Sequence, residues 1–168
     1  MTGQTVIWNG KATKMRSPEL SVAVVSSEND IAAVKDIFRA FLDFMPIDFG
    51  FQGIDAEMAR FPDGYEFLLL AKLSGQPIGA VALKRHTPEI CEMKRLFVLT
   101  DIQGTGAGRA LCDLLITEAT SRGFKTMLLD SLRRLESAGK LYQKLGFQEI
   151  APYNINPEED VYYMSRAL

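Results

Sequence analysis

The sequence predicts a single α/β domain, in which helices pack against a central β-sheet. Strand-like apolar runs alternate with segments whose apolar residues recur at helical spacing. The chain has 168 residues, of which 47% are hydrophobic and 24% charged, and this suits one soluble domain with a substantial core. Residues 20–168 are assigned to this domain. Residues 1–19 have little periodicity and are assigned to an N-terminal extension, either a short extra strand or a loose tail.

Capping and turn residues set the expected boundaries of the elements. Ser27 and Asp30 resemble a capping box, and Pro46 ends the helix that begins there. Gly146 stands where a helix C-terminus favours positive φ. The expected order is a strand at 20–25, a helix from 27 to 46, an aromatic loop at 47–53, a short helix at about 54–60, a hairpin of strands at 65–73 and 78–84, a strand at 90–99, a helix at about 106–122, a strand at 125–130, a helix across 135–145, and terminal strands at 147–150 and 160–164.

Composition and charge exclude several classes of partner. The net charge is −2 and no long Lys/Arg stripe occurs, so no nucleic-acid partner is expected. No apolar stretch reaches membrane-spanning length, and the first residues lack the pattern of a signal peptide, so we expect no membrane partner and a cytoplasmic location. Cys91 and Cys112 have no metal-type spacing and are interpreted as reduced, buried thiols. No metal site is expected.

The glycine cluster Gln103-Gly104-Thr105-Gly106-Ala107-Gly108-Arg109 lies between a strand and a helix. Backbone N–H groups at a helix start lack partners, and the helix dipole favours negative charge there, so the cluster predicts a phosphate-bearing ligand. A P-loop requires Gly-Lys-Ser/Thr, whereas Arg109 and Ala110 follow Gly108. A Rossmann turn requires a third glycine, and Arg109 occupies that position in this sequence. Asp130 nevertheless lies at a suitable distance to bind the ribose. A Rossmann-type dehydrogenase stays a weaker alternative.

Two motifs together resemble the GNAT acyltransferase superfamily. Gln103, Gly106 and Gly108 match its acyl-CoA signature Gln/Arg-x-x-Gly-x-Gly/Ala, and residues 141–147 resemble its Leu-Tyr-x-Lys-x-Gly-Phe segment. The resemblance implies a GNAT fold with a central mixed, mostly antiparallel sheet flanked by helices. It implies acetyl-CoA as cosubstrate, without metal, and acetyl transfer to a primary amine of a small molecule, such as an amino-acid-like compound. Terminal strands in this superfamily often pair across a homodimer.

The resemblance also assigns cofactor-binding residues. The amides of residues 104–109, beside Gln103, would cradle the pyrophosphate. The strand segment Leu96-Phe97-Val98 would accept the pantetheine arm and polarise the thioester carbonyl. Many members have an asparagine at the position that Leu135 occupies, so this sequence departs from the pattern there.

Tyr142 and Glu92 are the expected catalytic residues. In the superfamily the tyrosine protonates the leaving thiolate. In its histone-acetylating branch a glutamate eleven residues before the signature acts as general base through water, whereas many other members use other residues or water chains. Tyr142 also fits a buried tyrosine on an apolar helix face, and Glu92 fits an ion pair with Lys94 or Arg95. The only histidine, His86, is expected in a surface turn.

Lys94 and Arg95 are candidates for binding a carboxylate on the acceptor, with a structural ion pair as the alternative. Strand alternation sends them to opposite faces unless a bulge changes the local parity. Residues 43–65 and 151–157 would shape the acceptor site. Two other functions stay open: acetylation of protein N-termini or lysines, and a non-catalytic acyl-CoA-binding module.

Overall fold

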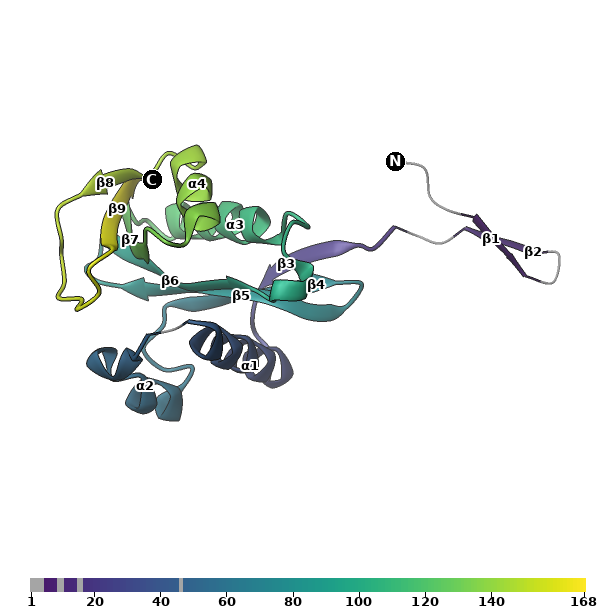
Figure 1. Cartoon of the computed structure of the whole chain (residues 1–168), viewed down its shortest axis with the longest axis horizontal. Helices are drawn as coiled ribbons and strands as arrows, with labels where there is room; N and C mark the ends of the chain where they lie inside the picture. The colour runs from purple at the N-terminus through teal and green to yellow at the C-terminus, as the bar shows by residue number, and fades with distance from the viewer. Residues whose placement is uncertain (1–4, 9–10, 15–16, 46) are drawn as a thin grey trace.

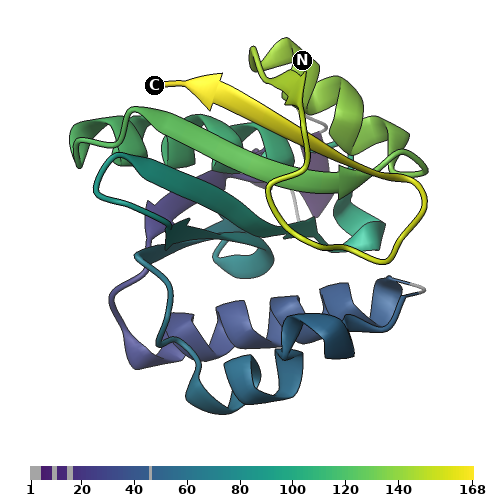
Figure 2. The same ribbon diagram turned by 90° about the vertical axis from the view of Figure 1, so that its left-hand side faces the viewer.

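A computed structural model describes residues 5–8, 11–14, 17–45 and 47–168. Its centre is a seven-stranded sheet in the order β3 (Leu20–Val24), β4 (Phe67–Leu73), β5 (Gln76–Arg85), β6 (Ile90–Val98), β7 (Thr126–Leu132), β9 (Val161–Ala167), β8 (Gln148–Ile150). Helices α1 (Glu28–Phe44) and α2 (Ile54–Arg60) cover one face, and α3 (Ala107–Ser121) and α4 (Glu136–Lys144) cover the other (Figure 1, Figure 2).

The sheet is mixed and mostly antiparallel, as predicted. Neighbouring strands pair antiparallel except β6 and β7, which run parallel. Parallel strands can be joined only by a long crossover connection, and here α3 provides it. The glycine cluster therefore lies in the crossover between the parallel strands.

Local signals account for most boundaries. The Ser27 hydroxyl accepts a hydrogen bond from the Asp30 amide at 3.1 Å, which confirms the predicted cap. Gly146 has φ 84°, as expected after the end of α4. Pro46, the predicted helix stop, lies outside the described residues.

The structure differs from the expected elements in three places. The aromatic loop contains a 3-10 turn, η1 (Phe49–Gln52), and a second one, η2 (Thr100–Ile102), precedes the glycine cluster. The last strand, expected at 160–164, runs to Ala167 because its end pairs with the start of β7 at Thr126. This strand also separates β7 from β8, an order that apolar patterning cannot predict.

The N-terminal strands β1 (Thr5–Trp8) and β2 (Lys11–Lys14) pair antiparallel with each other and form a separate two-stranded sheet (Figure 1). The described part of residues 1–19 thus contains two strands where one strand or a tail was expected. The division of the chain into an extension and a domain stays a prediction.

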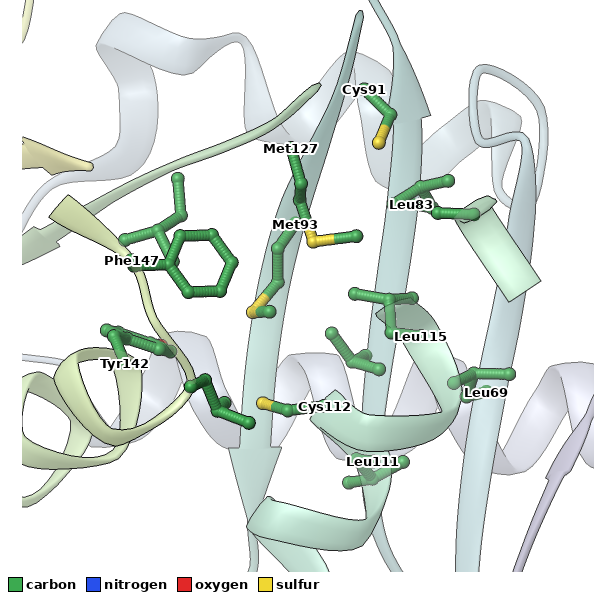
Figure 3. Packing of buried hydrophobic residues seen from close by; sticks show 14 of the residues in the cluster. Leu69, Leu83, Cys91, Met93, Leu111, Cys112, Leu115, Met127, Tyr142 and Phe147 are labelled. Carbon is green, nitrogen blue, oxygen red and sulfur yellow. The ribbon is translucent and has the colours of Figure 1, made fainter. Parts of the chain in front are cut away.

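The main core lies between the sheet and the α3 side (Figure 3). Leu111 and Leu115 of α3 pack against β-strand residues such as Leu69 and Leu83. Cys91 and Cys112 are buried free thiols in this core, and burial raises the pKa of each to about 12. Both are therefore protonated packing residues at neutral pH, as the sequence predicts.

Candidate active site

The parallel strands β6 and β7 separate after a short paired stretch. Among the described residues their pairing covers 90–92 of β6 and 126–128 of β7. Beyond Glu92 the strands diverge, and a cavity of about 110 Å³ lies at the gap. Its wall combines the middle of β6 and the end of β7 with parts of α1, η1 and α4. The lining residues are Phe41, Met45, Ile47, Phe49, Met93, Lys94, Arg95, Leu96, Leu129, Asp130, Ser131, Leu132, Leu135, Ala138, Tyr142 and Asn156.

A β-bulge in β6 determines which groups face this cavity. The register with β5 shifts between the pairs Ala82–Lys94 and Ala80–Phe97, so Arg95 and Leu96 together oppose a single residue of β5. Arg95 has φ 57°, a left-handed conformation that is uncommon for arginine. The bulge is the exception to strict alternation, and both Lys94 and Arg95 consequently line the cavity.

The residues that follow the bulge direct a backbone group into the gap. The Leu99 amide donates to the Ile78 carbonyl of β5 at 2.8 Å. Because bonding alternates along an antiparallel pair, the backbone groups of Val98 point away from β5, toward the separated β7. The Val98 carbonyl there accepts a hydrogen bond from Gln103 Nε2 at 3.2 Å.

The side chain of Phe97 takes a different direction from those of its neighbours. It packs against Phe41 of α1, with ring centroids 5.7 Å apart. Of the three residues 96–98, Phe97 thus contributes its side chain to the core under α1, while Leu96 lines the cavity.

The glycine cluster forms an exposed turn that ends in the N-terminus of α3. Gly104 and Gly106 have φ 89° and 84°, and a Cβ atom at either would meet no atom within 4 Å. Gly106 caps the helix without a side-chain hydrogen bond, and no described residue accepts from the backbone N–H groups of residues 104–109. These amides, at the positive end of the helix dipole, fit a phosphate group.

Two side chains of the turn have other partners. The Thr105 hydroxyl donates to the Ile102 carbonyl at 3.1 Å and stabilises the turn. Arg109 pairs through Nε with Asp113 one helical turn later at 3.0 Å, and both side chains are about half exposed. Gly108 is not required by the protein's own packing, because a Cβ there would make only ordinary contacts, the nearest 3.8 Å from Leu141.

Tyr142 of α4 is buried beside Phe147, with ring centroids 6.1 Å apart, at the edge of the main core (Figure 3). No described residue hydrogen-bonds its hydroxyl, yet no fully buried polar side-chain atom of the described chain lacks a partner. The hydroxyl therefore reaches the cavity that this residue lines. Burial raises the pKa of Tyr142, so the phenol stays protonated at neutral pH.

Glu92 is a buried carboxylate with three hydrogen-bonding neighbours. Its Oε2 lies 2.6 Å from His86 Nε2, and its Oε1 accepts from the Tyr153 hydroxyl at 2.9 Å and from Lys94 Nζ at 3.3 Å. Burial raises the pKa of Glu92, but the positive charge of Lys94 and the hydrogen bonds from His86 and Tyr153 outweigh burial and hold it below its ordinary value. Glu92 is thus ionised at neutral pH and lies just outside the cavity wall.

The two predicted cations are both paired. Lys94 Nζ lies 3.3 Å from Glu92 and 3.7 Å from Asp130. Arg95, whose side chain is 3% exposed, binds both oxygens of Glu57 on α2 at 2.9 and 3.2 Å and lies over the Phe49 ring. The geometry of Arg95 is that of the structural ion pair.

Three partners of the predicted residues were missed. His86 was expected in a surface turn, yet it contacts Glu92. Tyr153 reaches Glu92 from the loop between β8 and β9, which extends toward the α1 side of the sheet (Figure 2). Glu57 accepts from both Arg95 and Tyr65. Tyr153 and Glu57 lie far from their partners in the sequence, so no local pattern could indicate these contacts. His86 lies six residues before Glu92, across a turn, and this short separation was the only signal in the sequence.

Comparisons with known proteins identify the class. The model of the Acetyltransferase (GNAT) family matches residues 34–147. A protein described as an uncharacterized N-acetyltransferase from Schizosaccharomyces pombe is 31% identical over 156 residues, covering 89% of this chain and 96% of the relative. Another so described, from Dictyostelium discoideum, is 40% identical over 72 residues, 43% of this chain and 33% of the relative. The chain therefore belongs to the GNAT acetyltransferase family.

Solved structures agree in fold. An acetyltransferase from Streptococcus agalactiae superposes with a TM-score of 0.71 at 17% identity, covering 89% of this chain and 98% of that one. A Salmonella typhimurium protein solved with its cofactor acetyl-CoA has a TM-score of 0.64 at 22% identity, covering 88% and 93%. Within the described residues, no helix is long and apolar enough to span a membrane. No group of three or more His, Cys, Asp or Glu side chains in this part of the chain is placed to hold a metal ion.

Proposed function

We propose that this GNAT protein is a cytoplasmic N-acetyltransferase that transfers acetyl from acetyl-CoA directly to a primary amine of a small molecule. The observation that carries the proposal is the cavity between β6 and β7. Tyr142 borders it from α4, Leu96 borders it from β6, and Lys94, bound to Glu92, borders it from the α1 side.

The turn at 103–109 would hold the cosubstrate. Six consecutive amides without described partners, at the start of a helix, offer donors to the pyrophosphate oxygens. The open space above Gly104 and Gly106 lets the backbone approach a ligand closely. Acetyl-CoA supplies a thioester whose carbonyl carbon an amine nitrogen attacks. Amides of the segment 96–98, among them that of Val98, which points into the gap, would donate to the carbonyl oxygen as its negative charge grows.

Tyr142 would hold the proton that the departing sulfur needs. A thiolate desolvated in a closed cavity is more basic than in water, and this offsets the high pKa of a buried phenol. The hydroxyl has no described competing partner, so its proton is available to a group in the cavity.

Glu92 would receive the proton that the acceptor ammonium must lose before it attacks. Because Glu92 lies beside the cavity wall, this transfer requires an intervening water.

Lys94 would orient an anionic group on an amino-acid-like acceptor. Its ammonium has three donors and makes long contacts to its two carboxylate partners. β8 is an edge strand of the sheet, so its outer edge could pair with a strand of a second copy in a homodimer.

The test is acetyl-CoA turnover against a panel of amines, followed by the release of free CoA thiol. The panel combines small amines with amino acids, amino-acid-like compounds, and peptides that carry a free N-terminus or a lysine. We expect thiol release that depends on a small amine and matches the acetylated product in amount. Turnover with peptides alone would assign protein acetylation, and tight acetyl-CoA binding without turnover across the panel would assign a binding module.

A further inference from the structure

His86 connects the buried carboxylate of Glu92 to solvent. It is the only histidine of the chain and follows the last residue of β5. Its Nε2 lies 2.6 Å from Glu92 Oε2, and its side chain is 34% exposed where that of Glu92 is 5% exposed. The contact joins a group that water reaches to one that it barely touches.

The other groups that face Glu92 cannot take a proton from it. Lys94 has no lone pair while charged, and it is the donor in its contact. The Tyr153 hydroxyl donates to Glu92, and burial together with the charge of Glu92 raises the pKa of Tyr153. Asp130 of β7 contacts Lys94 rather than Glu92, and Lys84, the cross-strand partner on β5, is exposed. An imidazole nitrogen without a hydrogen has a lone pair, so His86 can accept a proton.

We propose that His86 carries to solvent the proton that Glu92 removes from the acceptor amine. The inference rests on the proposed function. Transfer of acetyl from a thioester to an ammonium gives an amide, a thiol and one released proton per turnover. That proton starts in the interior, on a carboxylate enclosed by three donors, and must leave before the next cycle.

The steps conserve the proton throughout. The N–H bond of the acceptor breaks, and the proton moves through water to the Glu92 carboxylate. His86 Nε2 carries a hydrogen while it donates to the carboxylate, so the neutral ring first exchanges this hydrogen with solvent for one on Nδ1. The carboxyl O–H then donates along the 2.6 Å contact to the freed Nε2 lone pair, which leaves carboxylate and imidazolium. The partly exposed ring then gives its Nδ1–H to water or buffer, which leaves Nε2–H against the carboxylate, so both groups return to their starting states.

The discriminating variant is His86→Gln, because the glutamine amide can still donate to Glu92 but cannot carry a proton. At low buffer concentration we expect kcat to fall about 10-fold or more, since general acid–base steps are worth at least that much. Added imidazole should restore most of the loss in His86→Gln and in His86→Ala. Tyr153→Phe is the matched control: it removes the other neutral donor to Glu92 and keeps the ring, so its loss should not respond to imidazole.

Two results would overturn the assignment of His86. One is wild-type kcat for His86→Gln at every buffer concentration, and the other is a loss that imidazole does not restore, which would leave His86 as a positioning residue. Because the chain has one histidine, its imidazole ¹⁵N spectrum in the protein without acetyl-CoA checks the contact directly. Glu92→Gln should move the Nε2 signal more than the Nδ1 signal, and equal or absent shifts contradict the contact. A wild-type protein without amine-dependent turnover would instead refute the proposed function.

Discussion

The hydroxyl of Tyr142 has no described hydrogen-bond partner and borders the cavity, which distinguishes it from a tyrosine kept only for packing. Tyr142→Phe retains the ring and its contact with Phe147, so the fold and the affinity for acetyl-CoA should persist. We expect kcat to fall by roughly 10²–10⁴-fold. Tyr162→Phe, which removes a hydroxyl from the same core but not from the cavity wall, should keep wild-type kcat. Equal kcat values for the two variants would make Tyr142 structural.

Lys94 and Arg95 differ in what remains free to bind an acceptor. The Arg95 guanidinium holds both oxygens of Glu57, whereas the Lys94 ammonium has three donors and contacts of 3.3 and 3.7 Å. Lys94→Met should therefore raise the KM of an anionic acceptor about 10- to 100-fold, the value of one charge-assisted hydrogen bond, with little change in acetyl-CoA affinity. Matched acceptors with and without the anionic group provide the measurement. If Lys94→Met leaves the preference for the anionic member unchanged, Lys94 serves only Glu92 and Asp130.

At the level of elements, the bulge of β6 is tied to α2 by the Arg95–Glu57 ion pair. Arg95 is almost fully buried, so Arg95→Met leaves Glu57 without its main partner and should cost about 2–4 kcal/mol in the free energy of unfolding. Urea unfolding monitored by circular dichroism measures this loss. The exposed pair of Arg39 and Asp36 in α1 supplies the control, because Arg39→Met should change stability by less than about 1 kcal/mol. Equal effects of the two substitutions would show that the buried pair does not anchor α2.

Local signals in the sequence predicted the elements but not the bulge. Ser27 and Gly146 determine helix ends through their own backbone neighbours, so a single sequence reveals them. The positive φ of Arg95 has no such signal, since arginine rarely adopts it and the conformation is held by β5 and by Glu57, which lies 38 residues earlier. The same limit applies to Tyr153, whose contact with Glu92 spans 61 residues.

For the whole molecule, the buried carboxylates predict acid sensitivity. Burial raises the pKa of Glu57, but hydrogen bonds from Arg95 and Tyr65 lower it further than burial raises it, and the pKa of Glu92 is also lowered. A carboxyl with a lowered pKa stabilises the fold above its unfolded pKa, about 4.3, and loses this contribution as pH falls through the folded pKa. The free energy of unfolding should thus decrease below about pH 5.

The variant Glu57→Gln isolates one part of that dependence. It cannot ionise, so its free energy of unfolding should fall less steeply between neutral pH and pH 3 than that of the wild type. Urea unfolding at a series of pH values gives both slopes. Parallel curves would mean that Glu57 has the same pKa in the folded and unfolded chain.

The glycine motif and the tyrosine segment indicated the family, and the two lie close together, because a Cβ atom at Gly108 would lie 3.8 Å from Leu141. Tyr142, next to Leu141, lines the cavity between β6 and β7. The sequence made Tyr142 and Glu92 candidates through their positions relative to the motifs, and Lys94 through its charge on the strand that also carries Glu92. It could not place His86, Asn156 or the α1 wall of the cavity, because those positions depend on packing between distant elements.

The most direct test of the account is the affinity of acetyl-CoA for Gly106→Asp, measured by isothermal titration calorimetry beside Gly75→Asp. Both glycines have φ 84° with open space at the Cβ position, so both substitutions carry the same backbone strain. Only Gly106 lies at the start of α3, where aspartate would oppose a pyrophosphate by charge and bulk. We expect Gly106→Asp to abolish measurable binding while Gly75→Asp binds as the wild type does. Wild-type affinity in a folded Gly106→Asp protein would contradict the proposed acetyl-CoA site.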